Sequence, residues 1–217
     1  MRLCILFILI CSCLVGSPPK VVVFDYGGVI AKVDRRPMLE FLSEHLGLSY
    51  KKVKKDFASD KLYQSLEKPL AFWEEYSKES LPSDWLEQLD HQKDLIVKEV
   101  PGMRELIEKL KSQDIQVVLL SNTKFHRARF IERHGGYDLF DPILLSCHLG
   151  MKKPDPKIYS TLLRTIGHPA EECLFIDNRK RNVSAGEDSG IDSIVFESLK
   201  QLIEELEKRE IALDDYS

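Results

Sequence analysis

The segment Val21–Ile30, which reads VVVFDYGGVI, constrains the fold more than any other part of the chain. Its apolar, β-branched residues are followed at once by one acid, Asp25, and by a glycine pair, Gly27 and Gly28. A short apolar run bounded by glycine predicts a buried strand over Val21–Asp25. A carboxylate at the end of such a strand lies at the rim of a sheet, where open α/β folds bind ligands.

Apolar strand patterns and helical patterns alternate after this segment. Strands alternating with helices of this size indicate right-handed βαβ units and a parallel sheet, so the predicted fold class is α/β. The further strands are predicted at Gln116–Leu120, Ile143–Ser146, Cys173–Asp177 and Ser193–Phe196. The helices are predicted at Met103–Ser112, Phe125–Arg133, Asp155–Ile166, Asn182–Ser189 and Leu199–Arg209.

One connection, from about Asp34 to Glu99, is too long for a simple crossover and contains no convincing strand pattern. Its position directly after the first strand predicts a helical cap over the ligand-binding edge of the sheet. The predicted division is a core of residues 18–33 and 99–217 and a helical cap of residues 34–98. Helices are expected at Met38–His45, Ser49–Ala58, Leu70–Ser77 and Asp84–Lys98.

Residues 1–17 differ from the rest of the chain. Arg2 is followed by an uncharged, apolar stretch too short for an ordinary membrane-spanning helix but suited to a signal peptide. The alternatives are a lipoprotein signal with lipidation at Cys13, an uncleaved anchor, or a misassigned start codon. Export is therefore expected, with membrane contact only through this segment. A cytoplasmic location is expected if the start codon is misassigned.

The composition excludes a general affinity for nucleic acids. The formal net charge is −4, and the densest basic stretch, Lys51–Lys55, fits a solvated helix face. Two cysteines remain after residue 17, Cys147 and Cys173, and their spacing favours free thiols over a disulfide.

Polar motifs stand at the ends of four predicted segments. In chain order they are FDYGGVI with Asp25, LLSNT with Ser121, GMKKPDPKIY with Lys153, and LFIDNRKRN with Asp177. These positions converge at the carboxyl edge of a parallel sheet. Phosphoryl transfer needs a nucleophile, positive charge on the phosphoryl oxygens and usually a divalent cation, and each has a candidate here.

The ordered motifs resemble those of the haloacid dehalogenase superfamily of aspartate-nucleophile hydrolases. The resemblance spans about Lys20 to Phe196. Residues 121–130 (SNTKFHRARF) and 145–159 (LSCHLGMKKPDPKIY) are similar to the bacterial sugar-1-phosphate phosphatase branch, typified by α-D-glucose-1-phosphate phosphatase. The resemblance implies a Rossmann-like core with an inserted helical cap, a phosphatase activity and a small phosphorylated metabolite as substrate.

The resemblance also implies site residues. Asp25 would be the nucleophile, Lys153 would stabilise the charge of the nucleophile and phosphoryl group, and Ser121 and Asn122 would bind the phosphoryl group. Mg²⁺ would be held by Asp25, the backbone carbonyl of Gly27, Asp177 and Asn178. His126 and Arg127, just after the second motif, are expected on a helix surface.

Two positions depart from the superfamily pattern. Gly27 stands where most of its phosphatases have an Asp that serves as general acid and base, although the sugar-1-phosphate branch also has Gly there. Asn178 stands where that branch typically has a second Asp, so weaker Mg²⁺ binding is expected. The alternatives are a catalytically impaired protein that binds a phosphorylated ligand or a protein partner, and a metal-free 2-haloacid dehalogenase.

Overall fold

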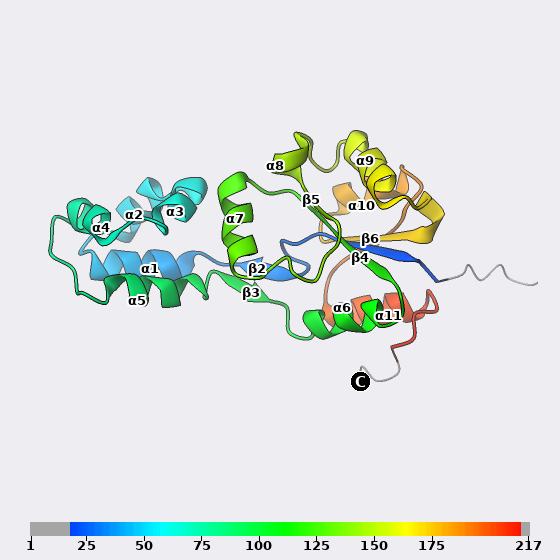
Figure 1. Cartoon of the computed structure of the whole chain (residues 1–217), viewed down its shortest axis with the longest axis horizontal. Helices are drawn as coiled ribbons and strands as arrows, with labels where there is room; N and C mark the ends of the chain where they lie inside the picture. Colours follow the sequence, from blue (N-terminus) through cyan, green and yellow to red (C-terminus); the bar gives the residue numbers. More distant parts are fainter. Residues whose placement is uncertain (1–17, 214–217) are drawn as a thin grey trace, which may run out of the picture.

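A computed structural model describes residues 18–213 of the chain. Its centre is a five-stranded parallel sheet in the order β5-β4-β1-β6-β7 (Figure 1). The strands are β1 (Val21–Phe24), β4 (Gln116–Ser121), β5 (Ile143–Leu145), β6 (Cys173–Asp177) and β7 (Asp192–Val195). The α/β class with a Rossmann-like parallel sheet is confirmed.

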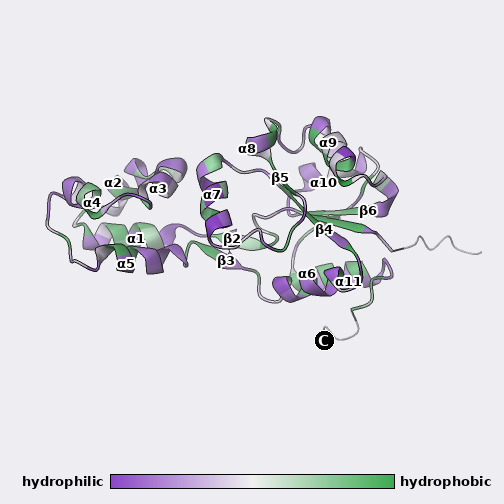
Figure 2. Ribbon diagram, viewed as in Figure 1, coloured by the Kyte–Doolittle hydropathy of each residue, from purple (hydrophilic) through white to green (hydrophobic). Residues whose placement is uncertain are grey.

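Helices cover both faces of this sheet, because alternate residues of each buried strand point to opposite sides. Val22 and Phe24 of β1 pack with α6 (Met103–Lys111) and α11 (Leu199–Glu207). Val21 and Val23 pack on the other side with α9 (Pro156–Ile166), and α10 (Lys180–Glu187) contacts β6 and β7. In Figure 2 the central strands are largely green, whereas α6 and α11 carry both colours.

A second, two-stranded antiparallel sheet joins the core to a group of helices. It consists of β2 (Ala31–Val33) and β3 (Val97–Glu99). Between these strands, the chain forms α1 (Arg36–His45), α2 (Tyr50–Asp56), α3 (Ser59–Ser65), α4 (Leu70–Ser77) and α5 (Trp85–Lys93). These helices lie to one side of the parallel sheet in Figure 1.

Two expectations for this segment are wrong. The helix expected over Asp84–Lys98 ends at Lys93, and the chain then extends into β3. The stretch that was expected to lack a strand therefore contains β3, which pairs with β2 through Ala31 and Glu99. The helix α3 was not predicted. Its seven residues are too few to show a clear helical period.

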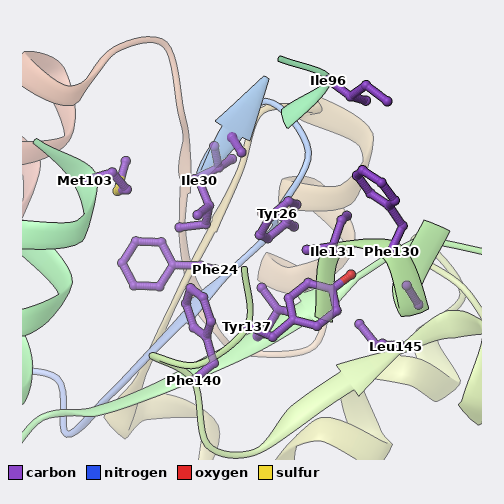
Figure 3. Close-up of a cluster of buried hydrophobic side chains, with 14 of the residues drawn as sticks. Phe24, Tyr26, Ile30, Ile96, Met103, Phe130, Ile131, Tyr137, Phe140 and Leu145 are labelled. Atoms are coloured by element: carbon purple, nitrogen blue, oxygen red, sulfur yellow. The ribbon is translucent and has the colours of Figure 1, made fainter. Parts of the chain in front are cut away.

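Aromatic side chains fill the interior of the helical segment and the part of the core beside the sheet, which belong to one buried cluster. Trp73 and Trp85 are fully buried, with ring centroids 5.8 Å apart. Closer to the sheet, Phe24, Tyr26 and Tyr137 belong to the buried cluster in Figure 3. This continuous packing fixes the helices relative to the carboxyl edge of the sheet.

The remaining elements are α7 (Phe125–Arg133) and α8 (Ser146–Leu149), with a short 3₁₀ turn at Ala170–Glu172. Cys147 and Cys173 are free thiols, as predicted. Within residues 18–213, no helix has the length and apolar character needed to cross a membrane. The predicted export signal in residues 1–17 lies outside the described residues.

Candidate active site

The carboxyl ends of β1, β4 and β6 bring together the residues predicted from separate motifs. Asp25 follows β1, which lies between the other two strands, while Ser121 ends β4 and Asp177 ends β6. Phe24 is paired with Leu119 on one side and Ile176 on the other, so the three polar residues lie at nearly the same level. Lys153 reaches the same edge from the loop before α9.

A buried charge network forms the floor of the site. The Lys153 ammonium donates to Asp25 Oδ1 (2.8 Å), to Asp177 Oδ2 (2.7 Å) and to the Leu120 carbonyl (2.5 Å). The side chains of Lys153 and Asp177 are fully buried, and that of Asp25 is 10% exposed. A buried lysine with three oxygen acceptors has all of its donors satisfied, which makes the arrangement rigid.

Burial raises the pKa of the Asp25 carboxyl above its ordinary value of 3.8. The positive charge of Lys153 opposes this shift, and the negative charge of Asp177 adds to it. Asp25 Oδ1 is held by Lys153, and a hydrogen bond from the Tyr26 backbone N–H also lowers the pKa of the carboxyl. No side chain among the described residues hydrogen-bonds Oδ2, and Asp25 lines a cavity. Asp25 therefore combines a fixed orientation with a carboxylate oxygen that no side chain occupies, as a nucleophile requires.

The Asn122 side chain holds the Lys153 loop in place. Its Nδ2 donates to the Lys153 carbonyl (2.8 Å), and its Oδ1 accepts from the Lys153 backbone N–H (2.9 Å). Ser121 is buried and lines the cavity, and in the described part of the chain its hydroxyl has no hydrogen-bond partner. Ser121 is thus the freer of the two to donate to a phosphoryl oxygen.

The cavity above Asp25 has a volume of about 280 Å³ and a mostly polar lining. Its walls come from the loop after β1, the end of β4, α7 and the start of α10. They are formed by Asp25, Tyr26, Gly27, Gly28, Val33, Ser121, Asn122, Thr123, Arg127, Ile131, Lys153, Arg179 and Asn182. The predicted Asp25, Gly27, Ser121, Asn122 and Lys153 all belong to this lining.

The other two predicted metal ligands lie outside the lining. Asp177 lies beneath it, and both its oxygens already accept hydrogen bonds, from Lys153, Asn182 Nδ2 (2.9 Å) and the Arg179 N–H (2.8 Å). Asn178 is exposed and packs against Gly28. Gly28 has φ +92°, a backbone conformation that residues with a Cβ rarely adopt, so glycine is required there by the backbone.

The oxygen atoms that face the cavity could bind a magnesium ion through one or two protein ligands. Asp25 offers a carboxylate oxygen that no side chain occupies, and Gly27 lines the same cavity with its backbone. Mg²⁺ keeps several waters and is commonly held by one or two carboxylates together with substrate phosphates. Within residues 18–213 no group of three or more His, Cys, Asp and Glu side chains is placed to hold a metal. The four-ligand set therefore stays a prediction.

Among the cavity residues that were not assigned to the site from the sequence, three have charged or amide side chains. Arg127 was expected on the surface of α7, but it is half-buried and lines the cavity. Arg179 and Asn182 also line it, and Asn182 is buried and donates to Asp177. Their positions depend on how the chain turns after β6, for which the sequence carries no periodic signal. Lys152, next to Lys153, is exposed, and Asp155 caps α9 by accepting a hydrogen bond from the Lys157 N–H.

Comparison with known proteins places the chain in a family. Residues 22–196 match the family described as haloacid dehalogenase-like hydrolase, and the chain belongs to it. A sesquiterpene phosphatase of Aspergillus oryzae is 31% identical over 137 residues, which cover 55% of this chain and 69% of that protein. A phosphorylated carbohydrates phosphatase of Thermotoga maritima is 32% identical over 102 residues, 46% of each protein.

Solved structures share the fold. A HAD family enzyme from Bacteroides thetaiotaomicron, solved as a magnesium complex, has a TM-score of 0.59 and 21% identity, covering 86% of this chain and 99% of that chain. The same enzyme with magnesium and inorganic phosphate has a TM-score of 0.57 and 21% identity, covering 85% of this chain and 98% of that chain. The prediction of a haloacid dehalogenase-type hydrolase is confirmed.

Proposed function

We propose that this hydrolase is a phosphatase for small phosphate monoesters with good leaving groups, and that it works through an aspartyl-phosphate. The observation that carries this proposal is the Asp25–Lys153–Asp177 network beneath a polar cavity, with one Asp25 oxygen that no side chain occupies. The phosphatase relatives from Aspergillus and Thermotoga support the same reaction class.

The proposed reaction has two displacement steps at phosphorus. Asp25 Oδ2 attacks the phosphoryl group, and the leaving-group oxygen departs with the electron pair. Lys153 holds Asp25 and offsets negative charge at the base of the cavity, while Ser121 donates to a phosphoryl oxygen. Water then attacks the phosphorus, which releases inorganic phosphate and restores the Asp25 carboxylate.

Magnesium is the proposed cofactor. Asp25 and the Gly27 carbonyl would hold it, with Asp177 and Asn178 in supporting positions behind them. When bound, the ion lowers the repulsion between two anions, the Asp25 carboxylate and the phosphoryl group. Because Asn178 replaces a negative ligand by a neutral one, we expect the affinity for Mg²⁺ to be low.

Gly27 restricts the leaving groups. General acid catalysis contributes roughly 10²–10⁴-fold, and a glycine cannot supply it. We therefore expect anomeric sugar phosphates, aryl phosphates and acyl phosphates to react faster than simple alkyl phosphates. The structure leaves room for an acid, since no heavy atom lies within 4 Å of a Cβ built on Gly27. Gly27→Asp should accelerate alkyl esters most, and similar rates on alkyl and aryl esters in the natural protein would contradict the idea.

The test is p-nitrophenyl phosphate hydrolysis with magnesium and with excess chelator. This ester has a good leaving group, so it does not need the missing acid. We expect magnesium-dependent turnover that Asp25→Asn abolishes and that Asp84→Asn, an exposed acid at the start of α5, leaves intact. Absence of turnover in the folded protein at high magnesium would reject catalysis and favour a phosphate-binding role.

A further inference from the structure

Two arginines line the cavity without an acidic partner among the described residues, the half-buried Arg127 and the exposed Arg179. Arg127 comes from α7, and Arg179 from the turn before α10. Within residues 18–213 neither forms an ion pair with a carboxylate. Arg127 Nε is buried and has no hydrogen-bond partner, and its guanidinium carbon lies 5.9 Å from the centre of the Tyr63 ring. Tyr63 thus supports Arg127 without satisfying its donors.

Lys153 already neutralises the acids at the base of the cavity, so Arg127 and Arg179 are not needed to neutralise them. Lys153 is shared between two carboxylates, Asp25 and Asp177, which offset its positive charge. Asp25 is the only acid in the cavity lining. Arg127 and Arg179 therefore leave uncompensated positive charge at the place where the substrate binds. Guanidinium groups bind phosphate oxygens through paired N–H donors, so a second phosphate would satisfy them.

The absence of an acidic side chain at Gly27 also favours a substrate with a second phosphate group. No acidic side chain other than Asp25 lines the cavity, so none is placed to protonate a leaving group. An alkoxide departs poorly without a proton. A phosphate group departs readily, because its second pKa is only about 6. A phosphoanhydride therefore fits the site in two ways. It carries a second anionic group for the two arginines, and its leaving group is a phosphate, which departs without being protonated.

We propose that the substrate is a diphosphate monoester, with its terminal phosphoryl group at Asp25 and its inner phosphate bound by Arg127 and Arg179. This inference rests on the phosphatase activity proposed above. Asp25 Oδ2 forms a bond to the terminal phosphorus, and the bond from that phosphorus to the bridging oxygen breaks. The bridging oxygen keeps the electron pair and leaves as part of a monophosphate ester. Water then cleaves the aspartyl-phosphate, and both of its protons end on inorganic phosphate.

The first experiment compares two esters of one alcohol, benzyl phosphate and benzyl diphosphate, at matched free magnesium. We expect kcat/KM for benzyl diphosphate to be at least tenfold higher. The products should be benzyl phosphate and inorganic phosphate, without benzyl alcohol in the first turnover. Equal kcat/KM for the two esters would overturn the proposal.

Charge-removing variants test the two arginines. Arg127→Gln and Arg179→Gln should each lower the preference for benzyl diphosphate over p-nitrophenyl phosphate by roughly ten- to a hundredfold, the range for a charged hydrogen bond. Arg127→Lys should restore part of it. The matched controls are Arg129→Gln on α7 and Arg181→Gln on α10, both exposed and outside the cavity lining. An unchanged preference in both cavity variants would overturn the assignment.

A binding assay separates this inference from the proposed function. Methylenediphosphonate mimics a diphosphate and is not hydrolysed, and methylphosphonate carries only one such group. We expect methylenediphosphonate to bind at least tenfold more tightly by calorimetry, and Arg127→Gln to remove most of the difference. If p-nitrophenyl phosphate is not hydrolysed but this difference holds, only the phosphatase proposal fails. Equal affinities alongside p-nitrophenyl phosphate turnover would reject only the diphosphate site.

Discussion

Lys153 joins two acids that would repel each other without it. Asp25 and Asp177 belong to adjacent strands, and the Lys153 ammonium lies within 2.8 Å of an oxygen of each. Removing one member of a buried ionic network leaves the others unpaired, which costs more than the network itself contributes. Lys153 is therefore required for the stability of this edge of the sheet as well as for the proposed chemistry.

Replacing Lys153 tests this dependence. We expect Lys153→Met to lower the free energy of unfolding by about 3–5 kcal/mol, because it leaves two buried carboxylates without a cation. Lys152→Met, at the exposed neighbouring position, should change it by less than about 0.5 kcal/mol. Urea unfolding of both variants at pH 7 measures the difference. Equal stabilities would show that the network contributes little.

Burial of Asp25 gives stability a specific pH dependence in metal-free buffer. Its pKa is raised in the folded protein, so between 3.8 and the raised pKa the native state binds more protons than the unfolded chain. The contribution of Asp25 to stability therefore decreases as pH rises through that window. Urea unfolding from pH 4 to 8 with chelator should show this decrease in the natural protein and its loss in Asp25→Asn. A parallel pH dependence in the two proteins would contradict the shift.

Asn178 is the residue at which a single charge should change metal affinity. Asn178→Asp restores a carboxylate beside Gly28, and hard cations favour such ligands. We expect half-maximal activation of p-nitrophenyl phosphate hydrolysis at a roughly tenfold lower magnesium concentration. Asp192→Asn, at a distant exposed acid paired with Arg209, changes the net charge by the same amount in the opposite direction and tests whether overall charge alone alters the magnesium requirement. An unchanged requirement would place position 178 outside the metal site.

At the scale of elements, α3 and α7 form the joint between the helical segment and the site. Tyr63 of α3 packs against Phe130 of α7 with ring centroids 5.3 Å apart. Polar pairs surround this contact: Asp60 with Lys124, Gln64 with His126 (2.6 Å), and Glu67 with Arg133. Because Arg127 also lies over Tyr63, this joint positions one wall of the cavity.

The apolar part of the joint should dominate its energetics. Tyr63→Ala removes a buried aromatic ring, and we expect a loss of about 3–5 kcal/mol in the free energy of unfolding. Glu67→Gln breaks an exposed ion pair and should cost less than about 1 kcal/mol. Thermal unfolding of both variants gives the comparison. A larger cost for Glu67→Gln would mean that the ion pairs hold the joint.

The length of an element decides whether the sequence could predict it. The apolar pattern of β1 and β6 and the helical period of α7 and α9 are long enough to identify each element to within a residue or two. By contrast, β2 (AKV) and β3 (VKE) have three residues each and are stable only because they pair with each other. Asp25, Ser121 and Lys153 were found because motifs mark them. Arg127 and Arg179 were missed, because their place depends on packing between distant segments.

For the whole molecule, the central position of β1 predicts a gradient of local stability. β1 has a hydrogen-bonded strand on each side and helices over both faces, and its four residues are fully buried. The helices α2 and α3 have only seven residues each and belong to the helical segment outside the parallel sheet. We expect amide exchange to be slowest at Val22–Phe24 and much faster in α2 and α3. Hydrogen exchange by mass spectrometry measures this, and uniform protection would contradict it.

The order of the strands has a consequence for the newly made chain. Val21 pairs with Gln116 and with Cys173, so β1, the first described strand to leave the ribosome, gains its two neighbours only after about 95 and about 150 further residues have been made. Until most of the chain has been synthesised, VVVF remains an apolar, β-prone segment without a partner. Such segments fold slowly and aggregate readily. Because Asp25, the proposed nucleophile, directly follows this central strand, we expect nascent chains to depend on protection during synthesis.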